Sequence, residues 1–62
     1  MAYFQQYTNT KDGLTAIVTD GNHVHPFRAI LKDIDADETV SVIFGSLATC
    51  YDKATQFVGE EN

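Results

Sequence analysis

Apolar residues near the end of the chain recur at helical spacing. Within the stretch 46–58 they fall three or four positions apart, which lines one face of a helix: Leu47, Cys50, Tyr51, Ala54, Phe57 and Val58. Ser46 stands just before this set, where its hydroxyl can cap the first turn. Gly59 follows it and can adopt the left-handed backbone that ends a helix. The pattern predicts one helix that covers a small sheet.

The preceding part of the chain alternates between apolar and polar residues, the period of a half-buried strand. It predicts four strands, over 2–8, 14–20, 27–34 and 39–45, separated by turn signals. Asp12-Gly13 is the strongest of these signals and favours a hairpin. The first strand is expected at an edge, because neither of its faces is purely apolar.

Short connections favour neighbouring antiparallel strands. The predicted fold is therefore α+β: a four-stranded antiparallel β-meander with one C-terminal α-helix packed on one face, residues 1–62 forming a single domain. The residues expected on the inner face, under the helix, are Phe4 (or Tyr3 and Tyr7), Leu14, Ala16, Val18, Phe27, Ala29, Leu31, Val40, Val42 and Phe44.

The net charge of −5 argues against direct contact with nucleic acids or anionic membranes, which need cationic side chains. It favours a basic protein partner, or serves solubility alone. The first residues lack the basic and apolar regions of a signal peptide, and no stretch approaches the ~20 apolar residues of a membrane span. A single cysteine excludes an internal disulfide. We therefore expect a cytoplasmic protein.

The meander would place the turns at 9–13 and 35–38 at the same end, and the helix would return its negative end there. Seven acidic residues, here called the acidic pole, should gather at that end: Asp12, Asp33, Asp35, Asp37, Glu38, Glu60 and Glu61. This clustering indicates a partner-binding site. The alternative is a solvated loop and tail whose charge has no partner.

The outer face of the sheet is a second candidate surface. One helix about 10 Å wide can cover only one face of four strands. The residues of outward parity proposed as an interface are Ile17, Arg28, Ile30, Lys32, Ile34 and Ile43. The alternative is that isoleucines stand there for strand propensity alone.

Two motifs suggest metal binding and fall short of it. Asp33, Asp35 and Asp37 have the spacing that opens a calcium loop, but the required glycine and bidentate glutamate are replaced by Glu38 and Phe44.

A second set, His23 and His25 near Asp20, lacks the fourth ligand of a closed zinc site. Cys50 is expected in the core and Ser46 at the helix cap. We expect no catalytic residue, no resident metal and no cofactor, and hence no enzyme.

The leading prediction is a small acidic binding protein that occupies a basic, nucleic-acid-binding surface of another protein. Anti-CRISPR and anti-restriction proteins of phages and mobile elements are similar in size and charge, an analogy of class that no residue motif carries. The alternatives are an assembly module that homodimerises through the outer sheet face and, less favoured, a low-affinity metal binder.

Overall fold

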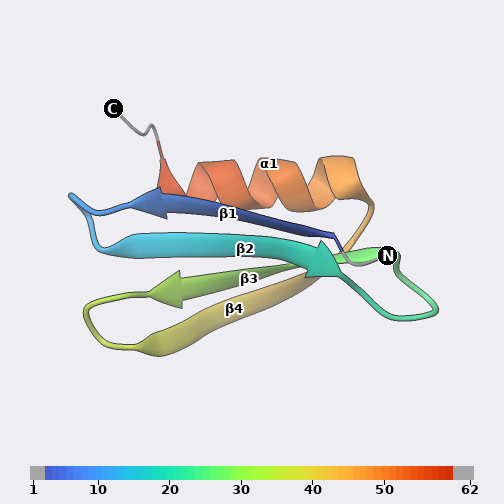
Figure 1. The fold of residues 1–62 in the computed structure, drawn as a ribbon, viewed down its shortest axis with the longest axis horizontal. Helices are drawn as coiled ribbons and strands as arrows, with labels where there is room; N and C mark the ends of the chain where they lie inside the picture. The colour runs from blue at the N-terminus through green and yellow to red at the C-terminus, as the bar shows by residue number, and fades with distance from the viewer. Residues whose placement is uncertain (1–2, 60–62) are drawn as a thin grey trace.

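A computed structural model describes residues 3–59 and confirms the α+β prediction. The strands β1 (Phe4–Asn9), β2 (Leu14–Asp20), β3 (Phe27–Asp33) and β4 (Glu38–Gly45) form one antiparallel sheet in the order β1-β2-β3-β4. The helix α1 (Leu47–Val58) crosses one face of that sheet (Figure 1). Within the described residues, no helix is long and apolar enough to cross a membrane.

Both ends of α1 are formed by the residues that the sequence indicates. The Ser46 hydroxyl accepts a hydrogen bond from the Thr49 N–H at 3.2 Å. Gly59 has a φ of 80°, and its N–H donates to the Thr55 carbonyl at 2.9 Å. With a ψ of −165°, this positive φ lies in an extended region that essentially only glycine adopts.

The core lies between α1 and the two central strands. Its buried members come from β2, β3 and one stripe of the helix: Ala16, Val18, Ala29, Leu31, Cys50, Ala54 and Val58. Of the two options for the first strand, Tyr3 and Tyr7 pack against this core. Phe4, the other option, is 64% exposed. The predicted parity is confirmed in β2 and β3.

The predicted parity of β4 is wrong. Ile43 pairs with Ala29 and packs against the core, whereas it was expected on the outer face. Val42 and Phe44 pair with Ile30 and Arg28, which are outward, and both are exposed. Val40, also expected inside, is exposed and lies where the register shifts: Leu31 pairs with Ser41 and Lys32 with Thr39, so Val40 is left as a bulge.

The start of the helix explains this inversion. The chain passes from Gly45 through Ser46 directly into α1, which lies over the inner face. Gly45 is the cross-strand partner of Phe27, which packs against the core, and a Cβ at Gly45 would be in ordinary contact with the Thr49 methyl carbon, at 3.4 Å. The inward position at this end of β4 therefore belongs to Gly45, and Phe44, one residue earlier, must point outward.

Candidate functional site

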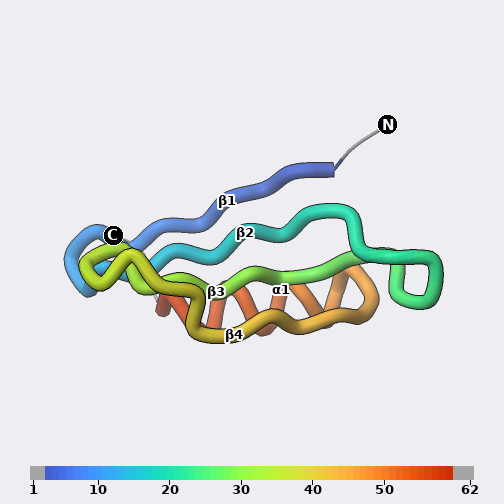
Figure 2. Tube along the Cα trace, turned by 90° about the horizontal axis from the view of Figure 1, so that it is seen from below, coloured from blue at the N-terminus to red at the C-terminus, as the bar shows by residue number. Residues whose placement is uncertain are grey.

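The two turns at one end of the sheet lie next to each other (Figure 2), and a main-chain hydrogen bond joins them. The Ile34 N–H, just after β3, donates to the Gly13 carbonyl in the β1–β2 turn at 2.8 Å. The Asp35 carboxylate lies directly against Gly13, where a Cβ would overlap it. Gly13 has a φ of 69°, so its conformation also favours glycine. This contact brings the described members of the acidic pole to one end.

The described carboxylates of the acidic pole are close in space and open to solvent. Asp12 lies in the first turn, and Asp33, Asp35, Asp37 and Glu38 surround the second; Asp33 is half-buried and the others are exposed. Asp33 and Glu38 are direct cross-strand partners, an arrangement in which like charges destabilise a sheet. The remaining predicted members, Glu60 and Glu61, lie outside the described residues.

Three of these aspartates also shape the turns. Asp33 Oδ1 accepts from the Ala36 N–H at 3.2 Å, and Asp37 adopts a φ of 54°. Asp12 Oδ2 accepts from the Asn9 side-chain amide at 3.1 Å. Asparagine can take the left-handed conformation and can accept backbone hydrogen bonds equally well. The turn geometry therefore explains short polar side chains at Asp33 and Asp37 but does not explain their charge.

The C-terminal end of α1 adds negative potential at the same end of the molecule (Figure 1). Its last carbonyl, that of Val58, accepts from Nδ2 of the buried Asn9 at 2.7 Å. The sequence places Asn9 only in a turn. Its role depends on where the helix ends above the sheet, a relationship that local sequence does not contain.

The outer face carries a row of apolar side chains across three strands. Ile17, Ile30 and Val42 are successive cross-strand partners, with Phe44 beside them on β4. Arg28 and Lys32 flank this row from β3. No part of the described chain covers this side of the sheet (Figures 1 and 2).

Two of the residues predicted for that face lie elsewhere. Ile43 points into the core, as described above. Ile34 lies beyond the end of β3, in the turn that contacts Gly13, and is 45% exposed. The apolar surface is therefore formed by Ile17, Ile30, Val42 and Phe44.

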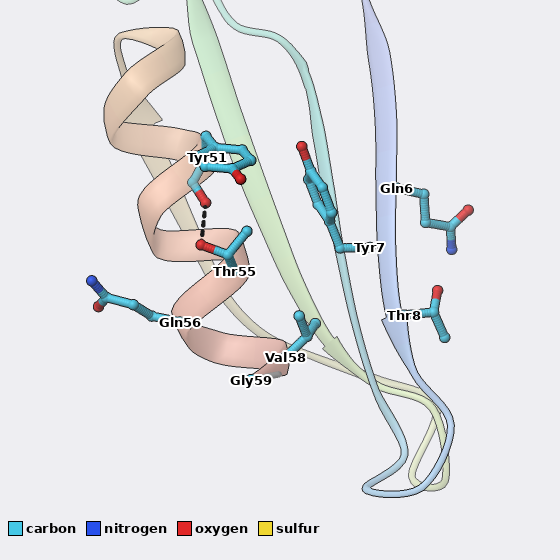
Figure 3. Close-up of a pocket in the computed structure, with 8 residues that line it drawn as sticks. All are labelled: Gln6, Tyr7, Thr8, Tyr51, Thr55, Gln56, Val58 and Gly59. Carbon is cyan, nitrogen blue, oxygen red and sulfur yellow. Dashed lines mark hydrogen bonds between the residues drawn. The ribbon is translucent and has the colours of Figure 1, made fainter. Parts of the chain in front are cut away.

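A groove of about 690 Å³ separates β1 from the C-terminal half of α1 (Figure 3). Tyr7 from the strand and Tyr51 from the helix meet edge to face in it, with ring centroids 5.8 Å apart. Burial, and secondarily the neighbouring phenols Tyr3 and Tyr51, raises the pKa of Tyr7. The sequence does not predict this groove, because the contact between Tyr7 and Tyr51 depends on the path of the helix across the sheet.

The metal-binding candidates are not brought together. Among residues 3–59, no three His, Cys, Asp or Glu side chains form a group that could hold a metal ion. The Asn22 side chain shapes the loop that contains His23 and His25 by accepting from the Val24 and His25 N–H groups. Cys50 is fully buried, and this burial raises the pKa of its thiol.

Comparison with protein-family models, curated proteins and solved structures finds no match to this chain.

Proposed function

We propose that this protein is a non-enzymatic, cytoplasmic binding protein whose acidic pole occupies a basic surface on another protein. The preferred surface is one that otherwise binds nucleic acid, because clustered carboxylates imitate the charge of successive phosphates. By class analogy, inhibitors of phages and mobile elements act in this way.

The cross-strand pair of Asp33 and Glu38 supports this proposal most directly. Like charges opposite one another oppose folding, and asparagine or glutamine would relieve that repulsion. The contact between Gly13 and Asp35 adds further carboxylates to the same end. Charge that is concentrated where it disfavours folding is the pattern expected of a binding surface.

The test compares two variants that remove the same amount of charge. Asp35→Asn with Asp37→Asn alters the acidic pole, and Asp20→Asn with Asp52→Asn alters exposed carboxylates elsewhere. The probe is a basic DNA-binding protein captured from the native host by the wild-type chain, with its own DNA as competitor. Association rates are measured at low and high salt, with a melting curve for each variant.

We expect the acidic-pole variant to associate more slowly at low salt and to compete less well with DNA. The control variant should behave like the wild type. The difference should shrink at high salt, because exposed charges beyond roughly 8 Å are already screened at physiological ionic strength. Equal association rates for the two variants at low salt would show that the acidic pole acts as solubilising charge only.

A second candidate is an assembly module that stacks the outer sheet faces of two copies. It is favoured by the uncovered row of Ile17, Ile30 and Val42. Arg28 and Lys32 would bring like charges together, so this dimer should strengthen as salt rises, opposite to binding through the acidic pole. Ile30→Asp should abolish it while the chain stays folded. Sedimentation of both proteins at two salt concentrations tests this candidate.

A further inference from the structure

The edge strand β1 turns a row of main-chain groups away from the sheet. The carbonyls of Tyr3 and Tyr7 accept from the hydroxyls of Thr19 and Thr15 on β2, at 2.8 and 3.0 Å, so these carbonyls point toward β2. Main-chain groups of successive strand residues point to opposite sides. The N–H and C=O groups of the intervening residues, Phe4, Gln6 and Thr8, therefore face outward at the open edge.

This edge lacks the devices that usually prevent pairing. Soluble proteins blunt their edge strands with charges, prolines or bulges. The sequence of β1, FQQYTN, has no charge and no proline, and its pairing with β2 runs without a register shift. The opposite edge, β4, begins with Glu38 and contains the bulge at Val40. Only β4 is protected.

The groove between β1 and α1 leaves room for the side chains of an added strand (Figure 3). Its walls carry the rings of Tyr7 and Tyr51, the side chain of Val58, and the uncharged polar groups of Thr55 and Gln56. A strand added at β1 would direct every second side chain toward this groove. The lining is uncharged, so it suits an uncharged segment.

We propose that β1 pairs antiparallel with β1 of a second copy of this chain, with Gln6 opposite Gln6 of the second copy. In this register the outward main-chain groups of Phe4 face those of Thr8 of the second copy. By symmetry, the outward main-chain groups of Thr8 face those of Phe4 of the second copy. Each of these pairs exchanges two main-chain hydrogen bonds. On the inner face, Gln5 of the second copy lies beside Tyr7 and extends toward the groove.

Two observations favour a second copy over an unrelated peptide. An antiparallel pair places the two acidic poles at opposite ends of the joined sheet, so copies with a net charge of −5 keep their carboxylate clusters apart. The joined sheet would also end in the protected β4 strand on both sides. A lone peptide would instead leave its own outer side as a new open edge.

The test is sedimentation from 1 μM to 1 mM of the wild type, Gln6→Pro and Gln6→Ala. Both substitutions remove the side-chain hydrogen bond from Gln6 to Thr15, but only proline removes the outward N–H. We expect the wild type and Gln6→Ala to dimerise with dissociation constants within about threefold of each other. Gln6→Pro should raise that constant by about tenfold or more while its melting curve shows a folded chain.

Crosslinking provides a readout that does not depend on how well Gln6→Pro folds. Paired strands hold opposite Cα atoms about 5.5 Å apart, within the range of a disulfide. Gln6→Cys should therefore form a covalent dimer on mild oxidation. Thr8→Cys should not, because the two copies of residue 8 would be about 13 Å apart along the strands.

A wild type that stays monomeric up to 1 mM would overturn the proposal. So would equal dissociation constants for the proline and alanine variants, or equal crosslinking at positions 6 and 8. A dimer that Ile30→Asp abolishes and Gln6→Pro leaves intact would instead assign assembly to the outer sheet face.

Discussion

Asn9 and Val58 lie 49 positions apart in the chain, and a hydrogen bond of 2.7 Å joins the side-chain amide of one to the main-chain carbonyl of the other. The second side-chain atom, Asn9 Oδ1, accepts from the Asp12 N–H at 3.1 Å. One buried side chain thus satisfies the end of α1 and shapes the β1–β2 turn. It fixes the end of the helix against the end of the sheet that carries the acidic pole.

Asn9→Ala should destabilise the fold by about 1–3 kcal/mol, because it leaves a buried carbonyl without its donor. Asn9→Asp should cost more, since a carboxylate would then face both the Val58 carbonyl and Asp12. Urea unfolding measures both, with the exposed Thr10→Ala as a near-neutral control. Equal stability of Asn9→Ala and the control would mean that water replaces this bond without loss.

Leu31 and Phe44 should respond differently to truncation. Leu31 is 6% exposed in the core, so Leu31→Ala should cost about 2–5 kcal/mol. Phe44 is 39% exposed on the outer face, so Phe44→Ala should cost clearly less, about 1 kcal/mol. The alternation pattern alone places both residues inside and predicts similar losses. Thermal melts of the two variants distinguish the observed parity of β4 from the predicted one.

The difference between β3 and β4 shows how far the sequence determines the fold. Phe27, Ala29 and Leu31 alternate with polar or outward residues, and one register satisfies them. In β4 the alternating positions put Val40, Val42 and Phe44 on one face and leave Ile43 as the single large apolar residue on the other. The larger apolar set therefore predicts the wrong face as the inner one. Gly45 takes the inward position opposite Phe27 where the chain turns into α1, and this depends on where the helix begins over the sheet.

The candidate sites also differ in how far the sequence alone predicts them. The acidic pole follows from topology, because a meander brings alternate turns to one end. The groove depends on the lateral position of α1, and no local pattern encodes that position. The open edge is predicted in part. Alternation and composition predict that β1 lies at an edge of the sheet. The outward direction of the Gln6 main-chain groups follows only from the hydrogen bonds that the Thr15 and Thr19 hydroxyls donate to β1.

Stability should fall at alkaline pH. Burial raises the pKa of the Cys50 thiol, and the folded state therefore favours its protonated form. This contribution is complete below the unfolded thiol pKa of about 8.5 and is lost as pH rises through the higher folded value. Tyr7, whose pKa is also raised, adds a similar loss above about pH 10.

The measurement is urea unfolding from pH 7 to pH 11 of the wild type and Cys50→Ala. From pH 8.5 upward, until the thiol of the folded state itself ionises, the wild type should lose stability at up to about 1.4 kcal/mol per pH unit more than the variant, whatever their stabilities at pH 7. Parallel curves for the two proteins in this interval would contradict a buried, protonated thiol.

Gly13→Ala should weaken the contact between the two turns of the acidic pole. The added methyl would meet the Asp35 carboxylate, and alanine disfavours the φ of 69°. We expect a loss of more than about 1 kcal/mol, together with faster hydrogen exchange of the Ile34 N–H, whose acceptor is the Gly13 carbonyl. Adding Asp35→Ala to Gly13→Ala should restore only the part of the lost stability that comes from the contact between the new methyl group and the Asp35 carboxylate.

The meander order of the sheet also bears on how fast the chain folds. Every strand pairs only with its neighbour in sequence, so each pairing closes a short loop. The contacts of α1 with β1 span nearly the whole chain and impose the largest loop entropy. The helix should therefore dock on β1 after the transition state has formed. In stopped-flow experiments Asn9→Ala should accelerate unfolding and leave the folding rate nearly unchanged, whereas Leu31→Ala should slow folding as well.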